Sequence, residues 1–127
     1  MLQHKEGLWD IPGGTIEVGE DYMATLRREL VEEAGARLVS FSILGAWHCI
    51  SMASEPYRPH LPFPEYYRVV GVGEVEIVQL PTNPPDGEQV KRVERVRLEI
   101  AIERFVNIGR RDLADLYRFA ADVISSE

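Results

Sequence analysis

The groups most able to do chemistry lie together in residues 13–35. Two glycines, Gly13 and Gly14, open this stretch, and Glu29, Glu32 and Glu33 crowd into one turn further on. At ~100° per residue of a helix, the three carboxylates fall within an arc of about 100°. Like charges at this spacing weaken a helix by ~0.2–0.5 kcal/mol per pair. Either this face is solvated, or something positive binds it.

Carboxylate oxygens are the ligands that hard divalent cations prefer, and Mg²⁺ typically adds water and phosphate oxygens to them. Arg28 lies beside the acidic arc, one turn from Glu32, where it can neutralise part of the charge. Glycines just upstream allow the backbone to approach a metal ion or a phosphate closely. On spacing alone, however, an acidic helix face is most often just solvated, and glycines before a helix are common turn residues.

A helix over residues 22–34 must position these groups. Asp21 is the expected N-cap and Gly35 the expected C′ residue. The apolar stripe of this helix recurs at helical spacing and consists of Met23, Leu26, Leu30 and Ala34. Because the acidic arc lies to one side of the stripe, the stripe can pack on a sheet while the carboxylates project into a groove.

The other segments predict a mixed sheet with helices packed on its faces, in a single α/β (α+β) domain over residues 1–127. Runs rich in Val, Ile and aromatic residues predict strands, and helical periodicity predicts two further helices. The expected strands are 1–5, 38–50, 66–79 and a shorter one at 90–98; the expected helices are 99–105 and 110–124.

The composition and net charge of the chain indicate which kinds of ligand it can bind. The chain is 45% hydrophobic with a net charge of −7, which argues against nucleic-acid binding through a basic surface. A phosphorylated small molecule remains a suitable ligand if arginines or metal ions are present locally. No secretory signal or membrane-length apolar run is visible, and Cys49 is the only cysteine, so we expect a cytoplasmic protein without a membrane or nucleic-acid partner.

In register, the stretch resembles the Nudix box, G-x5-E-x7-R-E-U-x-E-E-x-G-U, where U is aliphatic. The matching residues are Gly14, Glu20, Arg28, Glu29, Leu30, Glu32, Glu33, Gly35 and Ala36. Ala36 is smaller than the usual aliphatic residue. A chance match to the strictly specified positions is on the order of 10⁻⁸ per starting point. The preceding Ile11-Pro12-Gly13-Gly14 and Glu17 also look like the usual context of the family.

The resemblance implies a Nudix-type α/β/α sandwich and a pyrophosphohydrolase that uses Mg²⁺ or Mn²⁺. Such enzymes act on a nucleoside diphosphate linked to another moiety. It implies that Glu29, Glu32 and Glu33 bind the metal and that Arg28 orients Glu29. Glu20 would support the site, and the Gly14 carbonyl could complete a coordination shell. Glu29, or a carboxylate outside the box, would act as the base on water.

Residues outside the box add candidates for substrate binding. Glu88 is expected in a loop over the metals as a base or further ligand, with a plain charged loop tip as the alternative. In the proline-rich segment 56–64, Tyr57 could stack on a base, and Arg58 and His60 could meet phosphate or ribose. Strand aromatics such as Tyr67 are expected in the core. The substrate itself is not named by the sequence.

Two further expectations follow from the resemblance. Only eleven residues precede Pro12, so the usual first strand of the sheet is expected to be missing. A bare sheet edge invites association, which predicts a homodimer. Besides a hydrolase, the pattern allows a catalytically inactive Nudix-like nucleotide sensor, or a partner-binding domain whose acidic helix is merely solvated. The intact set of three glutamates argues against the sensor, and the register of Arg28 and the glycines argues against the partner-binding domain.

Overall fold

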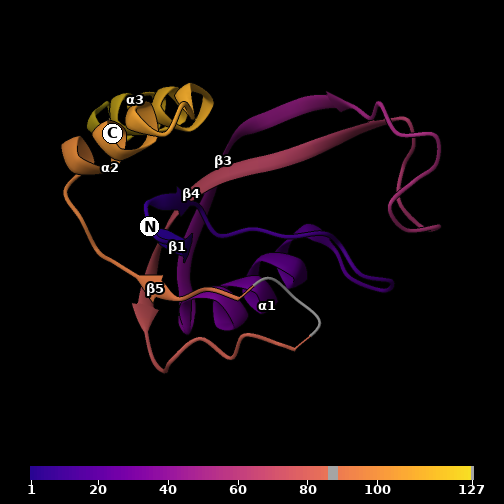
Figure 1. Ribbon diagram of the computed structural model, residues 1–127, viewed down its shortest axis with the longest axis horizontal. Coiled ribbons are helices and arrows are strands. Elements are labelled where there is room, and N and C mark those ends of the chain that lie inside the picture. The colour runs from indigo at the N-terminus through magenta and orange to yellow at the C-terminus, as the bar shows by residue number, and fades with distance from the viewer. Residues whose placement is uncertain (86–88, 127) are drawn as a thin grey trace.

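The computed structural model describes residues 1–85 and 89–126, apart from the side chain of Lys5. The chain runs through five strands and three helices in these ranges (Figure 1). In order they are β1 (Leu2–Lys5), β2 (Leu8–Asp10), α1 (Tyr22–Ala34), β3 (Ala36–Ile50), β4 (Glu65–Ile77), β5 (Arg92–Val93), α2 (Leu98–Asn107) and α3 (Arg111–Ser125).

Helix α1 begins and ends where its capping residues predict. The Asp21 side chain accepts a hydrogen bond of 2.8 Å from the Ala24 backbone N–H, which caps the first turn. At the other end, Gly35 adopts a left-handed conformation with φ of 60°, and its N–H donates to the carbonyl oxygens of the last turn. The expected helix over residues 22–34 is therefore confirmed at both ends.

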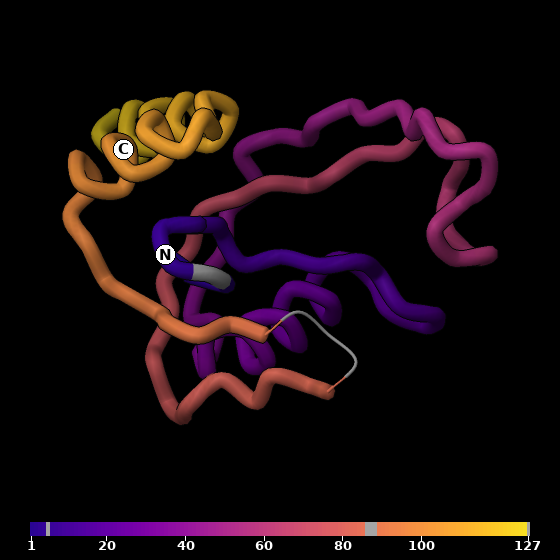
Figure 2. The backbone as a smooth tube through the Cα atoms, viewed as in Figure 1, coloured from indigo at the N-terminus to yellow at the C-terminus, as the bar shows by residue number. Residues whose placement is uncertain are grey.

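Strands β3 and β4 form a long antiparallel hairpin that pairs Ala36 with Ile77 at its base and Ile50 with Glu65 at its far end. Two irregularities in register, at Leu38/Ser40 and Ile43/Gly45, interrupt the ladder. The loop 51–64 joins the strands at the far end. It curls towards the loop 11–20 that precedes α1, on the right-hand side of the molecule (Figures 1 and 2).

The second sheet has the strand order β2–β1–β5. The sequence predicts one strand over residues 1–5, whereas the structure forms two around a turn at Gly7, whose φ is 74°. The strand expected over 90–98 is paired only at Arg92–Val93, because the chain then leaves the sheet for α2. All pairs among the described strands are antiparallel and fall into two sheets, so the expected single mixed sheet is replaced by this arrangement.

The strands lie between α1 on one side and the α2–α3 pair on the other, which confirms the α+β class and the layered arrangement (Figure 1). Two buried apolar clusters hold these layers together. One consists of Leu2, Leu30, Ala34, Ala36, Leu38 and Val90, and the other of Trp9, Phe105, Leu113 and Ala114. Because β2 contributes to the second cluster and α1 to the first, the loop 11–20 connects the two and is anchored at both ends.

None of the helices in the described part of the chain is long and apolar enough to cross a bilayer.

Replacing Gly35 by alanine should destabilise the fold. An added Cβ would clash with the Gln79 carbonyl oxygen at a residue whose φ is +60°. The left-handed conformation alone costs an alanine ~1–2 kcal/mol, and the clash adds to it. We expect urea denaturation to show a loss of at least ~2 kcal/mol. The control is Gly45→Ala, where nothing lies within 4 Å of the added Cβ. Equal stability of the two variants would contradict this account of the helix end.

Candidate functional site

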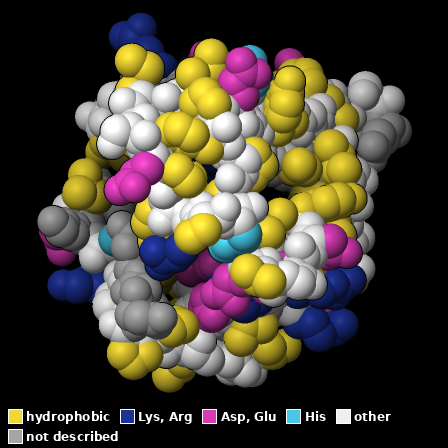
Figure 3. All heavy atoms as spheres, turned by 90° about the vertical axis from the view of Figure 1, so that its right-hand side faces the viewer, with side chains coloured by type: hydrophobic (Ala, Val, Ile, Leu, Met, Phe, Trp, Pro, Cys, Tyr) yellow, Lys and Arg dark blue, Asp and Glu magenta, His cyan; other side chains and the backbone are white. Residues whose placement is uncertain are grey.

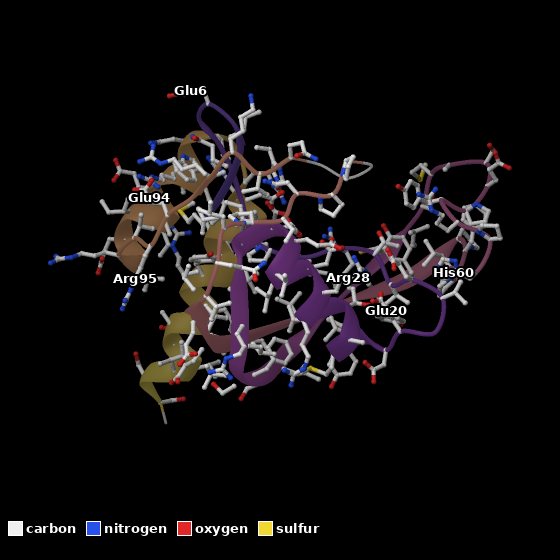
Figure 4. All side chains as sticks on the ribbon, turned by 90° about the horizontal axis from the view of Figure 1, so that it is seen from below. Glu6, Glu20, Arg28, His60, Glu94 and Arg95 are labelled. Atoms are coloured by element: carbon white, nitrogen blue, oxygen red, sulfur yellow. The ribbon has the colours of Figure 1, made fainter. Side chains whose placement is uncertain are left out.

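Arg28 binds several carboxylates at once. Its Nε donates to Glu20 Oε2 at 2.8 Å, and its Nη1 donates to Glu29 Oε1 at 2.8 Å and to Glu32 Oε2 at 3.3 Å. Its Nη2 also donates to the Thr15 carbonyl oxygen at 3.1 Å. These acceptors come from the loop 11–20 and from α1, and Figure 4 shows Arg28 beside Glu20. The guanidinium therefore fastens the glycine-containing loop to the helix and offsets part of the acidic charge.

Glu20 serves the loop as well as Arg28. Its Oε1 accepts from the Thr25 hydroxyl at 3.0 Å and from the Glu17 backbone N–H at 2.9 Å. The hydrogen bonds from Arg28, followed by the backbone N–H, lower the pKa of Glu20 to about 2. Glu20 is thus a fixed anion that closes the turn before α1. All the contacts described for its carboxylate are with protein groups.

The carboxyl groups of Glu29 and Glu33 lie against the backbone of Gly13 and Gly14. The Glu29 Oε1 atom occupies the space that a Cβ on Gly14 would fill. Glu33 Oε1 accepts from the Gly13 N–H at 3.2 Å. Burial, and then the neighbouring Glu29, raise the pKa of Glu33 to about 8. Near neutral pH, the Glu33 carboxyl group is therefore held mainly in its neutral form.

Glu32 interacts both with Arg28 and with the charge of Glu29. Its carboxylate reaches Arg28, and its pKa is raised first by burial and then by the charge of Glu29. The Glu32 side chain is 25% exposed, against 14% for Glu29. Glu32 is therefore a carboxylate that is shared with Arg28 and still open to solvent.

The donor set fits a small divalent cation. In this conformation, no three His, Cys, Asp or Glu side chains within residues 1–85 and 89–126 converge enough to hold a metal ion by themselves. Mg²⁺ typically takes only one or two carboxylates and completes its shell with water and substrate phosphates. Glu29 and Glu33, one helical turn apart beside Gly13 and Gly14, supply two such carboxyl groups.

The structure brings most of the predicted site residues together on one side of the molecule. These are Gly14, Glu20, Arg28, Glu29, Glu32 and Glu33. Tyr57 and Arg58 lie in the loop 51–64, where the Arg58 guanidinium stacks over the Tyr57 ring at 4.3 Å. Glu88 lies outside the described residues.

Some contacts near the site are not predicted by the sequence. Gly13 donates its N–H to Glu33, although the pattern drew attention to Gly14; the preceding proline-glycine turn was the available signal. His60 was considered only for phosphate or ribose, whereas its Nε2 lies 2.8 Å from the Ile16 carbonyl oxygen. No sequence spacing marks a contact between residues so far apart. Tyr67, expected in the core, is 68% exposed and stacks on His48.

Comparisons with known proteins found a matching family and a relative that matches part of the chain. The family described as NUDIX domain matches the chain over residues 2–116. A Xenopus laevis protein named m7GpppN-mRNA hydrolase NUDT17 is 50% identical over 42 residues. The matched segment is 32% of this chain and 14% of that protein. No solved structure was found to match the chain.

A methyl group on Gly14 should disrupt the carboxylate pair, because an added Cβ would overlap the Glu29 carboxylate. We expect Gly14→Ala to weaken Mn²⁺ binding by about 10- to 100-fold in calorimetric or electron paramagnetic resonance titrations. The matched control is Gly13→Ala, where nothing lies within 4 Å of the added Cβ and the N–H to Glu33 is kept. Equal Mn²⁺ affinity of both variants would argue against a cation beside Glu29.

The proton on Glu33 should also appear in the pH dependence of stability. The pKa of Glu33 rises from 4.5 to about 8 on folding, so the metal-free folded state binds more protons than the unfolded chain in this range. The free energy of unfolding should therefore fall as pH rises from about 4.5 to 8.

Urea denaturation with a chelator, repeated across this range, tests the prediction. Glu33→Gln should flatten this part of the slope, whereas Glu99→Gln on the exposed face of α2 should keep it. A wild-type slope that is unchanged in Glu33→Gln would show that Glu33 titrates normally.

Proposed function

The chain belongs to the Nudix domain family, and from this premise we propose that it is a metal-dependent pyrophosphohydrolase. Its substrate would be a nucleoside diphosphate linked to another moiety. The observation that carries this proposal is the placement of the Glu29 and Glu33 carboxyl groups against Gly13 and Gly14, with Glu29 oriented by Arg28. The relative that is named as an mRNA hydrolase supports the reaction class for the matched segment.

Glu29 and Glu33 would hold Mg²⁺ or Mn²⁺, with Glu32 and the Gly14 carbonyl as further donors. When bound, the ion would screen phosphate charge, stabilise the leaving phosphate and lower the pKa of bound water. Glu32 can join this set only by sharing its carboxylate with Arg28, which now reaches it at 3.3 Å. The acidic residues therefore do not contribute equally, and Glu29 and Glu33 are the primary ligands of the proposal.

The protein's own groups have distinct tasks in this proposal. Arg28 fixes Glu29 Oε1 by a hydrogen bond of 2.8 Å, which orients the carboxylate. Glu20 keeps Arg28 in place through two hydrogen bonds and remains an anion at any physiological pH. Glu33 gives up its proton when positive charge arrives beside it. Glu29, or a carboxylate outside the box such as Glu88, accepts the proton of the attacking water.

Substrate contacts are assigned to the loop 51–64. Tyr57 is 71% exposed, and its ring is already stacked with the Arg58 guanidinium. An exposed aromatic ring can stack on a nucleotide base, and a guanidinium can pair with phosphate. This pair supplies the local positive charge that an acidic protein needs for a phosphorylated ligand.

Neutralising the box glutamates should remove activity without unfolding the protein. We expect Glu29→Gln, Glu32→Gln and Glu33→Gln each to lower kcat/KM by ~10²-fold or more. The assay follows phosphate release, after phosphatase coupling, from a panel of ADP-ribose, NADH, dinucleoside polyphosphates, sugar nucleotides and oxidised nucleoside triphosphates with Mg²⁺ or Mn²⁺. Circular dichroism and urea denaturation check the fold.

Glu99→Gln is the control for charge removal, because Glu99 is exposed on α2. Full metal-dependent turnover by the Glu29 and Glu33 variants would contradict the proposal. Nucleotide binding by the wild type without any turnover would identify a sensor in place of a hydrolase.

A further inference from the structure

Two loops that are distant in the sequence meet beside the carboxylate site. The loop 51–64 joins β3 to β4, and the loop 11–20 joins β2 to α1. His60 Nε2 of the first loop lies 2.8 Å from the Ile16 carbonyl oxygen of the second. Figure 4 shows His60 on the same side of the molecule as Arg28 and Glu20. On this face, acidic, basic and histidine side chains gather near the centre (Figure 3).

The chemistry of this contact defines the role of the histidine. A backbone carbonyl oxygen can only accept, so His60 must donate through a protonated Nε2. The neighbouring carbonyl, that of Thr15, accepts from Arg28 Nη2 at 3.1 Å. Two consecutive carbonyls of the glycine-containing loop are therefore held by different elements, one by α1 and one by the hairpin loop.

Hydrogen bonds within the loop 51–64 restrain its backbone, so that fixing His60 would also restrain its neighbours. The Ser51 N–H donates to the Pro64 carbonyl oxygen at 2.8 Å and closes the neck of the loop. The Leu61 N–H donates to the Arg58 carbonyl oxygen at 3.1 Å, which forms a turn around His60. Prolines at positions 56, 59, 62 and 64 restrict the backbone further. Fixing His60 therefore also restricts Arg58, which begins this turn, and Tyr57, whose ring stacks against the Arg58 guanidinium.

We propose that His60 is a positioning residue for substrate binding. Its hydrogen bond to Ile16 holds the loop 51–64, which carries the Tyr57–Arg58 pair, against the loop 11–20, which carries Gly13 and Gly14. This inference rests on the proposed hydrolase function. In that setting, His60 acts on the nucleotide end of the substrate through Tyr57 and Arg58, and the bond-breaking step is left to the box residues.

Kinetics of His60 variants test the positioning role. His60→Ala should raise KM about 3- to 10-fold and leave kcat within about 2-fold, because it removes one exposed hydrogen bond and no box residue. His60→Gln should restore KM, since the glutamine Nε2 can donate at a similar reach. His60→Asn is too short at that position and should behave like His60→Ala. The matched control is His48→Gln, on β3, where the histidine stacks on Tyr67.

A measurement without substrate separates the loop contact from the activity. Chymotrypsin cleaves after Tyr57, which is 71% exposed, and mass spectrometry identifies that cut. A loosened loop should be cut at least about 3-fold faster in His60→Ala than in wild type, and His60→Gln should resemble wild type.

The outcomes are distinct. Equal cleavage of wild type and His60→Ala would overturn the loop contact. Faster cleavage with an unchanged KM would overturn the substrate role of the contact. A wild-type protein that hydrolyses no nucleotide would refute the proposed function, while the cleavage rates would still decide whether His60 holds the loops together.

Discussion

The site depends on one guanidinium that neutralises some carboxylates of an acidic helix and leaves others. Arg28 contacts Glu20, Glu29 and Glu32, and it also binds the Thr15 carbonyl. Without it, the glutamates of one helical turn would repel one another and the preceding loop would lose its connection to α1. Glu33 is bound instead by the Gly13 backbone N–H, and its pKa is raised, chiefly by burial. Arg28 therefore balances charge on Glu20, Glu29 and Glu32, while Glu33 lies against the backbone of the glycine-containing loop.

The positions of Glu29 and Glu33 explain the roles of Gly13 and Gly14. Gly14 has no Cβ where the Glu29 carboxylate lies, and Gly13 offers an N–H to Glu33. The loop is anchored at one end by Trp9 in the cluster with Phe105 and at the other by the capped start of α1. Both cores thus support the same short segment. Because the pKa of Glu33 is raised, the proposed site would release a proton when a divalent ion binds.

The parts that the sequence could predict are those that local rules determine. Helix α1 was predicted to its end residues because Asp21 and Gly35 cap it, and the box residues were located by their register. Tyr67 was misplaced in the core because exposure of a hairpin face depends on what packs against it. The short pairing of β5 and the division into two sheets likewise depend on contacts between segments far apart in the chain.

The proposed metal binding depends on residues close together in the sequence, whereas the proposed substrate binding depends on contacts between distant segments. The carboxylates of α1 and the loop before it lie within one continuous stretch, so a single motif can encode the proposed metal chemistry. The proposed substrate contacts lie in the loop 51–64, and the residue that joins them to the glycine-containing loop is 44 positions away from its partner. In this proposal, substitutions in the hairpin loop would alter which nucleotide binds without disturbing the Arg28 network. The box identifies the family, and the turn around His60 is where specificity would have to be sought.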